Sequence, residues 1–161
     1  MDIEKIGFGG GCHWCTEGVF SIIKGVTNID QGWIASKPPN DQHSEAVLLL
    51  FNPSIIQQED LISIHLQTHA CTSGHSMREK YRSAIYTFNQ AQALMARQSI
   101  DQLQVGFNEK IITEILPFYS FKPSQKKYQN YYQKNPKRPF CETYISPKVL
   151  MLLKEFNHLT V

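Results

Sequence analysis

The residues best suited to chemistry form the Cys-His-Trp-Cys stretch at 12–15, which directly follows three glycines. A short apolar segment at 6–8 precedes it, and apolar residues at helical spacing follow from Val19. Cys12 is therefore expected at the N-terminus of a helix, where free backbone N–H groups and the helix dipole stabilise an anion. Because a thiolate is such an anion, this position favours a reactive cysteine.

The same stretch has other interpretations. Glycine-rich turns also bind phosphates, but no lysine follows here as in a P-loop. A Cys-x-x-Cys pair can be half of a zinc site, yet Cys71 and Cys141 stand alone. Two buried structural cysteines are a further interpretation, and the adjacent glycines count against it. The one plausible metal cluster consists of His65 and His69, with Cys71 and His75 nearby. Its spacing matches no defined zinc site, so no metal or other cofactor is predicted.

Length and composition predict the class of protein. The 161 residues are expected to form one domain, 1–161, and four cysteines are too few for a disulfide scaffold. The first residues lack the features of a signal peptide, and no apolar run approaches the roughly 20 residues that span a membrane. We therefore expect a cytoplasmic protein with no membrane segment, where thiols stay reduced. The net charge of +2 does not favour a partner chosen by bulk charge.

Strand-like and helix-like segments alternate along the chain. Apolar patterning predicts strands at 6–8, 26–33, 46–51, 81–88 and 111–116. It predicts helices at 14–24, 59–68, 89–104 and 124–134, and a last helix that begins with Ser146 as its N-cap.

Glu45 comes directly before the continuous apolar strand at 46–51. A carboxyl at the mouth of a buried strand is partly desolvated, which favours its protonated form and suits a general acid. The alternative is an ordinary strand-end glutamate in water, and from spacing alone we favour this exposed position.

The segment 122–138 holds six basic residues interleaved with tyrosines, and it contains no acidic residue. This pattern occurs on nucleic-acid-binding faces, where cations hold phosphates and rings stack on bases. It is more typical of a solvated helix with half-packed tyrosines. Because the rest of the chain shows no nucleic-acid-binding module, no nucleic-acid partner is predicted.

Several motifs together carry a resemblance. In their order and spacing, four motifs resemble those of the A-type peptide methionine sulfoxide reductases. They are the glycine-cysteine stretch, Ser-Glu-Ala-Val at 44–47, His-Ala-Cys-Thr at 69–72 and Lys-Tyr-Arg-Ser-Ala-Ile at 80–85. The similarity covers nearly the whole chain. It implies an α+β fold, namely a two-layer α/β sandwich related to the ferredoxin-like plait, with a mixed, mainly antiparallel sheet. It also implies a protein that reduces the S epimer of methionine sulfoxide, free or within proteins. We expect this protein to be a monomer.

The resemblance assigns roles to individual residues. Cys12 matches the nucleophile that attacks the sulfoxide sulfur. Glu45 matches the acid that protonates or hydrogen-bonds the sulfoxide oxygen, which reverses the expectation from spacing alone. Trp14 matches the aromatic floor under the substrate's methyl group. Tyr81 matches one of two tyrosines that bind the oxygen.

The resulting sulfenic acid must be resolved to a disulfide, which thioredoxin or a similar dithiol then reduces. Cys15 is the nearest resolving candidate, because some members of the family use this spacing. Cys141 lies in the C-terminal region where other members keep resolving cysteines, and it is the alternative. Cys71 stands where the family usually has proline and receives no role.

The departures from the family pattern fall in the expected pocket. His13 replaces the usual phenylalanine, Trp33 replaces the second oxygen-binding tyrosine, and Ser76 replaces an aspartate. A histidine makes the pocket less apolar and sensitive to pH. These changes are expected to alter substrate preference while leaving the chemistry of Cys12 and Glu45 in place.

Three alternative functions remain open at this point. A thiol-disulfide oxidoreductase would use Cys12 without needing Glu45. A redox sensor would recognise oxidised methionine without completing the cycle. A nucleic-acid binder would use the segment 122–138 and would bind less tightly as salt increases.

Overall fold

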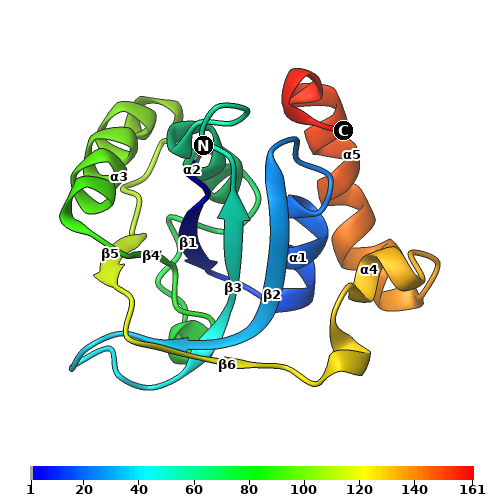
Figure 1. Ribbon diagram of the computed structural model, residues 1–161, viewed down its shortest axis with the longest axis horizontal. Coiled ribbons are helices and arrows are strands. Elements are labelled where there is room, and N and C mark those ends of the chain that lie inside the picture. Colours follow the sequence, from blue (N-terminus) through cyan, green and yellow to red (C-terminus); the bar gives the residue numbers. More distant parts are fainter. Residues whose placement is uncertain (1) are drawn as a thin grey trace.

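The computed structural model describes residues 2–161, except that the side chain of Ser76 lies outside the described part. Within these residues, six strands form one sheet (Figure 1). The strands are β1 (Glu4–Gly9), β2 (Val26–Ala35), β3 (Ser44–Phe51), β4 (Ala84–Thr87), β5 (Glu114–Pro117) and β6 (Ser120–Pro123). The helices are α1 (His13–Phe20), α2 (Gln58–Gln67), α3 (Gln90–Leu103), α4 (Tyr131–Lys134) and α5 (Ser146–Glu155).

The order of the strands brings the end of β1 to the start of β3. The sheet runs β5-β4-β1-β3-β2-β6, and every neighbouring pair is antiparallel except β4 and β5. In the β1–β3 pair, Gly9 lies opposite Ala46. The loop that follows Gly9 therefore begins beside Glu45. This mixed sheet with its helices confirms the predicted α+β class.

The two faces of the sheet carry different apolar clusters. On one face, Phe8 of β1 stacks on Phe20 of α1, with ring centroids 5.1 Å apart. The main core on this face also includes buried residues of α2, α3 and α5. The opposite face carries a smaller cluster of Ile34, Ala46, Ala84 and Tyr86 with Phe118 and Phe121 packed against it. This alternation follows from the two-residue period of a strand.

The first helix is shorter than the predicted segment 14–24, because α1 ends at Phe20. The hydroxyl of Ser21 donates to the carbonyl of Gly18 (2.7 Å), and Ile23 forms an isolated β-bridge with Thr160 near the C-terminus. The predicted helix is therefore wrong over its last turn, where contacts with a distant segment replace helical ones.

Two strand boundaries also differ from prediction. The strand predicted at 81–88 begins only at Ala84, because the Tyr81 N–H donates to the carbonyl of Met77 in a turn. The strand predicted at 111–116 begins at Glu114, because the Ile112 N–H bonds the carbonyl of Cys71.

The C-terminal segments differ as well. The helix predicted at 124–134 is divided into a 3-10 turn, η3 (Lys126–Tyr128), and α4, with Asn130 between them in a left-handed conformation (φ +56°). Ser146 is not an N-cap, because a π-helical turn, η4 (Cys141–Ile145), runs directly into α5. The predicted start of a last helix at Ser146 is confirmed, and its predicted cap is wrong.

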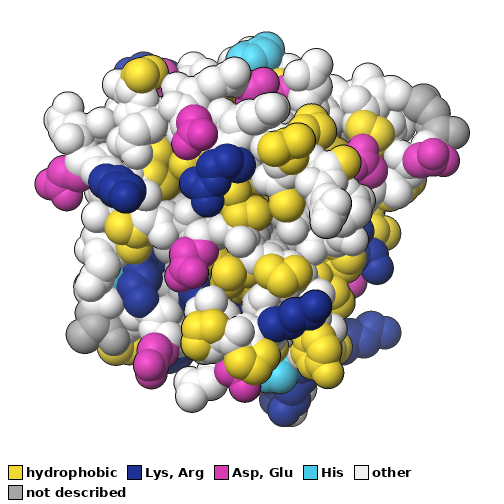
Figure 2. Space-filling model, turned by 90° about the vertical axis from the view of Figure 1, so that its left-hand side faces the viewer, with side chains coloured by type: hydrophobic (Ala, Val, Ile, Leu, Met, Phe, Trp, Pro, Cys, Tyr) yellow, Lys and Arg dark blue, Asp and Glu magenta, His cyan; other side chains and the backbone are white. Residues whose placement is uncertain are grey.

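The surface beside α3 mixes the two signs of charge. Figure 2 shows this side, on which cationic and anionic side chains are interspersed with apolar ones. Within the described residues, no helix has both the length and the apolar character needed to cross a membrane.

Candidate active site

Cys12 is the N-cap residue of α1 and is half-buried, as the sequence predicts for a reactive thiol. Its carbonyl accepts the N–H groups of Cys15 (3.0 Å) and Thr16 (3.2 Å), which begin the helix. The pKa of the Cys12 thiol is lowered, first because the Cys15 side chain donates to it and also because the backbone N–H of Trp14 does so. Burial and the nearby Glu45 charge raise this pKa, but they do not outweigh the hydrogen bonds.

Cys15 behaves in the opposite way. Its pKa is raised, first by its hydrogen bond to Cys12 and then by burial, so it stays a protonated thiol. Cys141 is fully buried at the start of η4 and shares an apolar cluster with Cys15, and burial raises its pKa as well. The structure therefore brings Cys12, Cys15 and Cys141 together, whereas Cys71 lies in the main core.

Glu45 is buried, with 7% of its surface exposed, so the exposed strand-end position favoured from spacing alone is wrong. Within β3 it shares a face with Val47, and this face packs against the helices. Its Oε1 accepts the backbone N–H of His13 at 3.1 Å, and its Oε2 lies 3.8 Å from Nζ of Lys80. The carboxylate is thus held one residue away from Cys12.

His13 joins the glutamate to β2. Its Nδ1 lies 2.8 Å from the carbonyl oxygen of Gly32 and 3.7 Å from Oε1 of Glu45. A carbonyl can only accept, so Nδ1 carries the hydrogen. The His13 ring meets the Trp33 ring edge-on, with centroids 5.2 Å apart, and Trp33 lies opposite Glu45 in the β2–β3 register. His13, Trp33 and Glu45 therefore meet at one site, as the sequence predicts.

Trp14 lies in an aromatic cluster. Its ring stacks on Tyr131 with centroids 4.0 Å apart and planes inclined by 10°, and Phe140 meets it edge-on at 5.6 Å. Within the described residues, the buried Nε1 of Trp14 has no hydrogen-bond partner. Tyr131 and Phe140 are contacts that the sequence did not predict, because the segments that hold them are far from Trp14 in the chain.

Glu17 holds Tyr131 in this position. This glutamate is 1% exposed, and its carboxylate accepts the backbone N–H groups of Asn130 (2.8 Å) and Tyr131 (3.1 Å). Burial raises its pKa, and these hydrogen bonds oppose the shift. The sequence contained no signal for this role, because the partners of Glu17 at 130 and 131 are far away in the chain, so that no local pattern could have indicated the role.

Tyr81 is linked to the glutamate through Lys80. The ammonium of Lys80 lies 5.1 Å from the centre of the Tyr81 ring and forms the ion pair with Glu45. The pKa of Lys80 is raised, first by a hydrogen bond with the Tyr81 side chain. Sequence reasoning assigned no role to Lys80. The predicted contribution of the Ser76 side chain lies outside the described residues.

The glycine loop before Cys12 is supported from behind. Nε2 of His65 lies 2.7 Å from the Gly9 carbonyl, and the Arg78 guanidinium donates to the carbonyls of Gly10 and Tyr81, both at 2.8 Å. The His69 ring packs where a side chain at Gly10 would lie, which explains the glycine at that position. Burial lowers the pKa of His69 to about 4, so this histidine is neutral.

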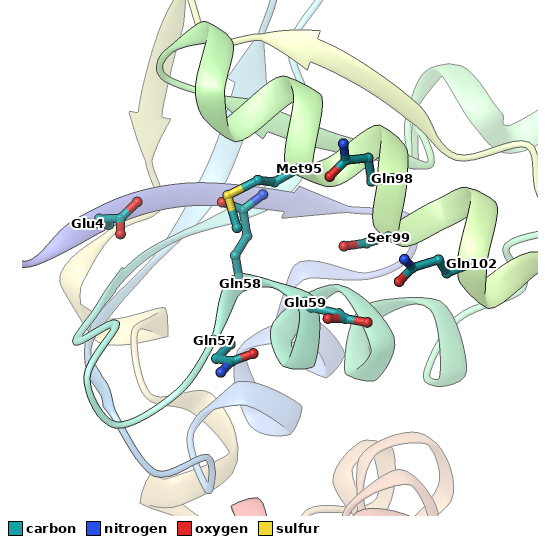
Figure 3. Close-up of a pocket in the computed structure, with 8 residues that line it drawn as sticks. All are labelled: Glu4, Gln57, Gln58, Glu59, Met95, Gln98, Ser99 and Gln102. Carbon is teal, nitrogen blue, oxygen red and sulfur yellow. The ribbon is translucent and has the colours of Figure 1, made fainter.

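A separate polar pocket lies between α2 and α3 (Figure 3). Its lining includes Gln58 and Glu59 of α2, and Ser99 and Gln102 of α3. None of the residues around Cys12 lines it, so this pocket is not part of the candidate site.

Comparisons with known proteins agree with this geometry. Residues 4–159 match the family model described as peptide methionine sulfoxide reductase. A peptide methionine sulfoxide reductase MsrA of Deinococcus radiodurans is 36% identical over 170 residues, covering 96% of this chain and 82% of that protein. An MsrA of Sulfolobus acidocaldarius is 32% identical over 168 residues and covers 96% of both chains.

Solved structures show the same fold. Methionine sulfoxide reductase A of Corynebacterium diphtheriae is 26% identical with a TM-score of 0.73, covering 83% of this chain and 76% of that one. Mxr1 from Saccharomyces cerevisiae, solved in complex with Trx2, is 19% identical with a TM-score of 0.64, covering 80% and 84%. From the family match and the identities over nearly the full length, the chain belongs to the A-type peptide methionine sulfoxide reductases.

Proposed function

We propose that the chain reduces methionine S-sulfoxide with Cys12 as nucleophile and Glu45 as general acid. The observation that supports this most directly is the pairing of a thiol at the N-cap of α1, whose pKa is lowered by hydrogen bonds, with a buried carboxyl that accepts the N–H of the next residue. A nucleophile and an acid fixed on one helical turn can act together on the sulfur and the oxygen of one S=O bond.

The first step transfers oxygen from the substrate to the enzyme. The Cys12 thiolate attacks the sulfoxide sulfur while Glu45 supplies a proton to the oxygen. The attack joins the two sulfur atoms. This S–S bond and the S–O bond of the substrate then break as the protonated oxygen transfers to the Cys12 sulfur, and the products are methionine and a sulfenic acid on Cys12. The cysteine sulfur loses two electrons, and the methionine sulfur gains them.

The second step closes a disulfide. The Cys15 thiol attacks the sulfur of the Cys12 sulfenic acid, and the oxygen leaves as water. The hydrogen bond between the two side chains supports Cys15 as the resolving thiol, and Cys141 in the same cluster is the second candidate. An external dithiol then reduces the disulfide and is itself oxidised. We propose thioredoxin for this role, by analogy with the solved complex of Mxr1 with Trx2.

The substrate side chain is proposed to lie between the aromatic residues. Trp14 supplies a flat apolar surface for the methyl group, and Trp33 with His13 lines the side next to Glu45. Tyr81 is proposed to bind the sulfoxide oxygen, which is supported by its contact with Lys80, the partner of Glu45 in an ion pair.

Two features of organisation complete the proposal. The central strands run β4-β1-β3-β2, with α1 between β1 and β2 and α2 between β3 and β4, which supports a ferredoxin-like plait in a two-layer sandwich. We propose one catalytic domain that works in the cytoplasm, where the thiols it needs are kept reduced.

The test measures reduction of each epimer of an N-blocked methionine sulfoxide with dithiothreitol as reductant. We expect the wild type to reduce the S epimer alone, Cys12→Ser to be inactive, and Glu45→Gln to lose roughly 10²–10⁴ in kcat/KM. Cys71→Ala is the matched control and should keep full kcat/KM, because Cys71 lies in the main core away from the site.

Peptide mapping after one turnover without reductant identifies the resolving thiol. A Cys12–Cys15 disulfide supports the proposal, and a Cys12–Cys141 disulfide would replace Cys15 in it. If the wild type reduces neither epimer while Cys12 alkylates rapidly, the proposed reaction is wrong and a thiol-disulfide oxidoreductase or a redox sensor takes its place.

A further inference from the structure

The charges of the chain are distributed unevenly. The stretch 115–141 holds six of the 16 cationic residues and none of the 14 acidic ones. It therefore carries a charge of +6, and the rest of the chain carries −4. The cationic rim, as we name this set, consists of Lys122, Lys126, Lys127, Lys134, Lys137 and Arg138.

Contacts place three members of the cationic rim beside Trp14 and Trp33. Lys122 of β6 lies opposite Trp33 in the β2–β6 register. The Lys127 ammonium lies 5.1 Å from the centre of the Tyr128 ring, which is itself 6.0 Å from the Trp14 ring. The Arg138 guanidinium lies 4.0 Å from the centre of the Tyr131 ring on which Trp14 stacks. The positive charges therefore border the proposed substrate pocket.

The cations of the rim are not neutralised within the molecule. The lysines are exposed, and among the described residues none of the six forms an ion pair. Lys134 donates only to backbone carbonyls, those of Lys126 and Lys127. Glu17 lies beneath this segment, but it is buried and its carboxylate is occupied by backbone N–H groups. The rim is therefore free to attract a carboxylate from outside.

The tyrosines of the segment favour an acidic peptide over a nucleic acid. Base stacking needs an open aromatic face. Tyr131 has Trp14 stacked against it and the Arg138 guanidinium over its ring, and Tyr128 has Lys127 over its ring. The ring of Tyr131 is thus covered within the protein, and the ring of Tyr128, which is 38% exposed, is partly occupied. The ammonium groups of the other exposed lysines of the rim form no ion pair with a described carboxylate and remain available.

We propose that the cationic rim binds carboxylates next to the oxidised methionine, so that the preferred substrates are methionine sulfoxides within acidic peptide segments. This inference rests on the proposed function and adds its substrate class. An extended peptide advances about 3.3 Å per residue, so acidic side chains one to three positions from the methionine reach the rim. Lys80, on the other side beside Glu45, is engaged in its own ion pair and is not part of the rim.

The experiment compares three peptides that share one central methionine S-sulfoxide, flanked on both sides by aspartate, asparagine or lysine. Dithiothreitol serves as reductant, so that docking of a protein reductant does not contribute. We expect kcat/KM for the aspartate peptide to exceed that for the asparagine peptide about tenfold or more at low ionic strength. The ratio should fall toward one in 0.5 M salt, because exposed charges are screened there.

Charge-removing variants locate the effect. The rim variant combines Lys122→Gln, Lys126→Gln and Lys127→Gln. It should bring the ratio of kcat/KM for the aspartate peptide to that for the asparagine peptide close to one. The matched control combines Lys24→Gln, Lys110→Gln and Lys154→Gln, which lowers the net charge equally outside the rim, and it should keep the wild-type ratio.

Several outcomes would overturn the inference. Equal kcat/KM for the three peptides in the wild type would do so, as would a preference that the rim variant retains. If the rim variant changes only the KM for thioredoxin, the surface docks the reductant and the inference is wrong. If no sulfoxide is reduced at all, the proposed function fails and this inference fails with it, a result distinct from equal rates on the three peptides.

Discussion

At the scale of single residues, two thiols of one helical turn differ in their protonation. Cys12 and Cys15 are three positions apart, yet the pKa of one is lowered and that of the other is raised, because Cys15 donates its hydrogen to Cys12. The donor must be protonated for this bond to exist, so the pair favours one thiolate and one thiol. The same bond keeps the two side chains in contact, as the proposed disulfide step requires.

The Cys15 hydrogen bond predicts a change in the pH dependence of Cys12. A lowered pKa means that the thiolate persists below the pH at which an ordinary thiol is protonated. Cys15→Ala removes the donor, so the pKa of Cys12 should rise and the pH profile of its alkylation should move to higher pH. At a pH below the pKa, raising the pKa by about one lowers the thiolate fraction about tenfold.

The measurement is the rate of iodoacetamide labelling of Cys12 between pH 5 and 10 in the reduced protein. Cys15→Ser is the matched variant, because its hydroxyl can still donate, and it should lie between wild type and Cys15→Ala. Identical profiles for wild type and Cys15→Ala would show that the Cys15 hydrogen bond does not set the pKa of Cys12.

At the scale of elements, the site depends on the close approach of β6 to β2. A side-chain carbon at Gly32 would lie 2.2 Å from the carbonyl oxygen of Lys122, so only glycine fits between these strands. The Gly32 carbonyl also accepts a hydrogen bond from Nδ1 of His13, which links β2 to the first turn of α1. One residue therefore aligns the strand that carries Trp33 with the helix that carries Cys12.

Gly32→Ala should separate β6 from β2. We expect it to destabilise the fold by about 1–3 kcal/mol, the usual cost of overpacking, and to lower kcat/KM because His13 and Trp33 shift. Urea unfolding and steady-state kinetics measure the two effects. Gly106→Ala is the control and should change stability by no more than about 0.5 kcal/mol, because nothing lies within 4 Å of the added carbon. Equal stability of the two variants would contradict the close-approach argument.

At the scale of the whole molecule, α5 joins two apolar clusters. Leu152 is fully buried in the main core beneath the sheet, and Val149 of the same helix packs in the smaller cluster with Cys15 and Cys141. The C-terminal segment therefore couples the stability of the core to the surroundings of the reactive thiols. Figure 1 shows α5 beside α1 at the right of the molecule.

Leu152→Ala should lower the free energy of unfolding by about 2–5 kcal/mol, the usual cost of a buried leucine cavity. Leu150→Ala is the matched control on the same helix, because Leu150 is 66% exposed, and it should be nearly neutral. Thermal or urea unfolding measures the difference. A similar loss in both variants would mean that the helix contributes through its intrinsic stability and not through the core contact of Leu152.

Local patterns in the sequence determined the class of the fold and the position of Cys12 at a helix N-terminus. A short strand, three glycines and a helical apolar pattern place Cys12 at a helix N-terminus, and the structure puts it there. The apolar run after Glu45 likewise marks β3. These predictions succeed because each depends on residues that are neighbours in the chain, and the motif resemblance adds the family and its expected chemistry.

Contacts between distant segments decided the rest. Tertiary packing buries Glu45 and stacks Tyr131 on Trp14. It also brings Cys141 beside Cys15. Helix and strand ends such as Phe20 and Ala84 were mispredicted for the same reason. Periodicity reports which face of a segment is apolar, but it does not report which other segment covers that face. Only the folded chain, in which β1 ends beside the start of β3, determines which of these residues meet.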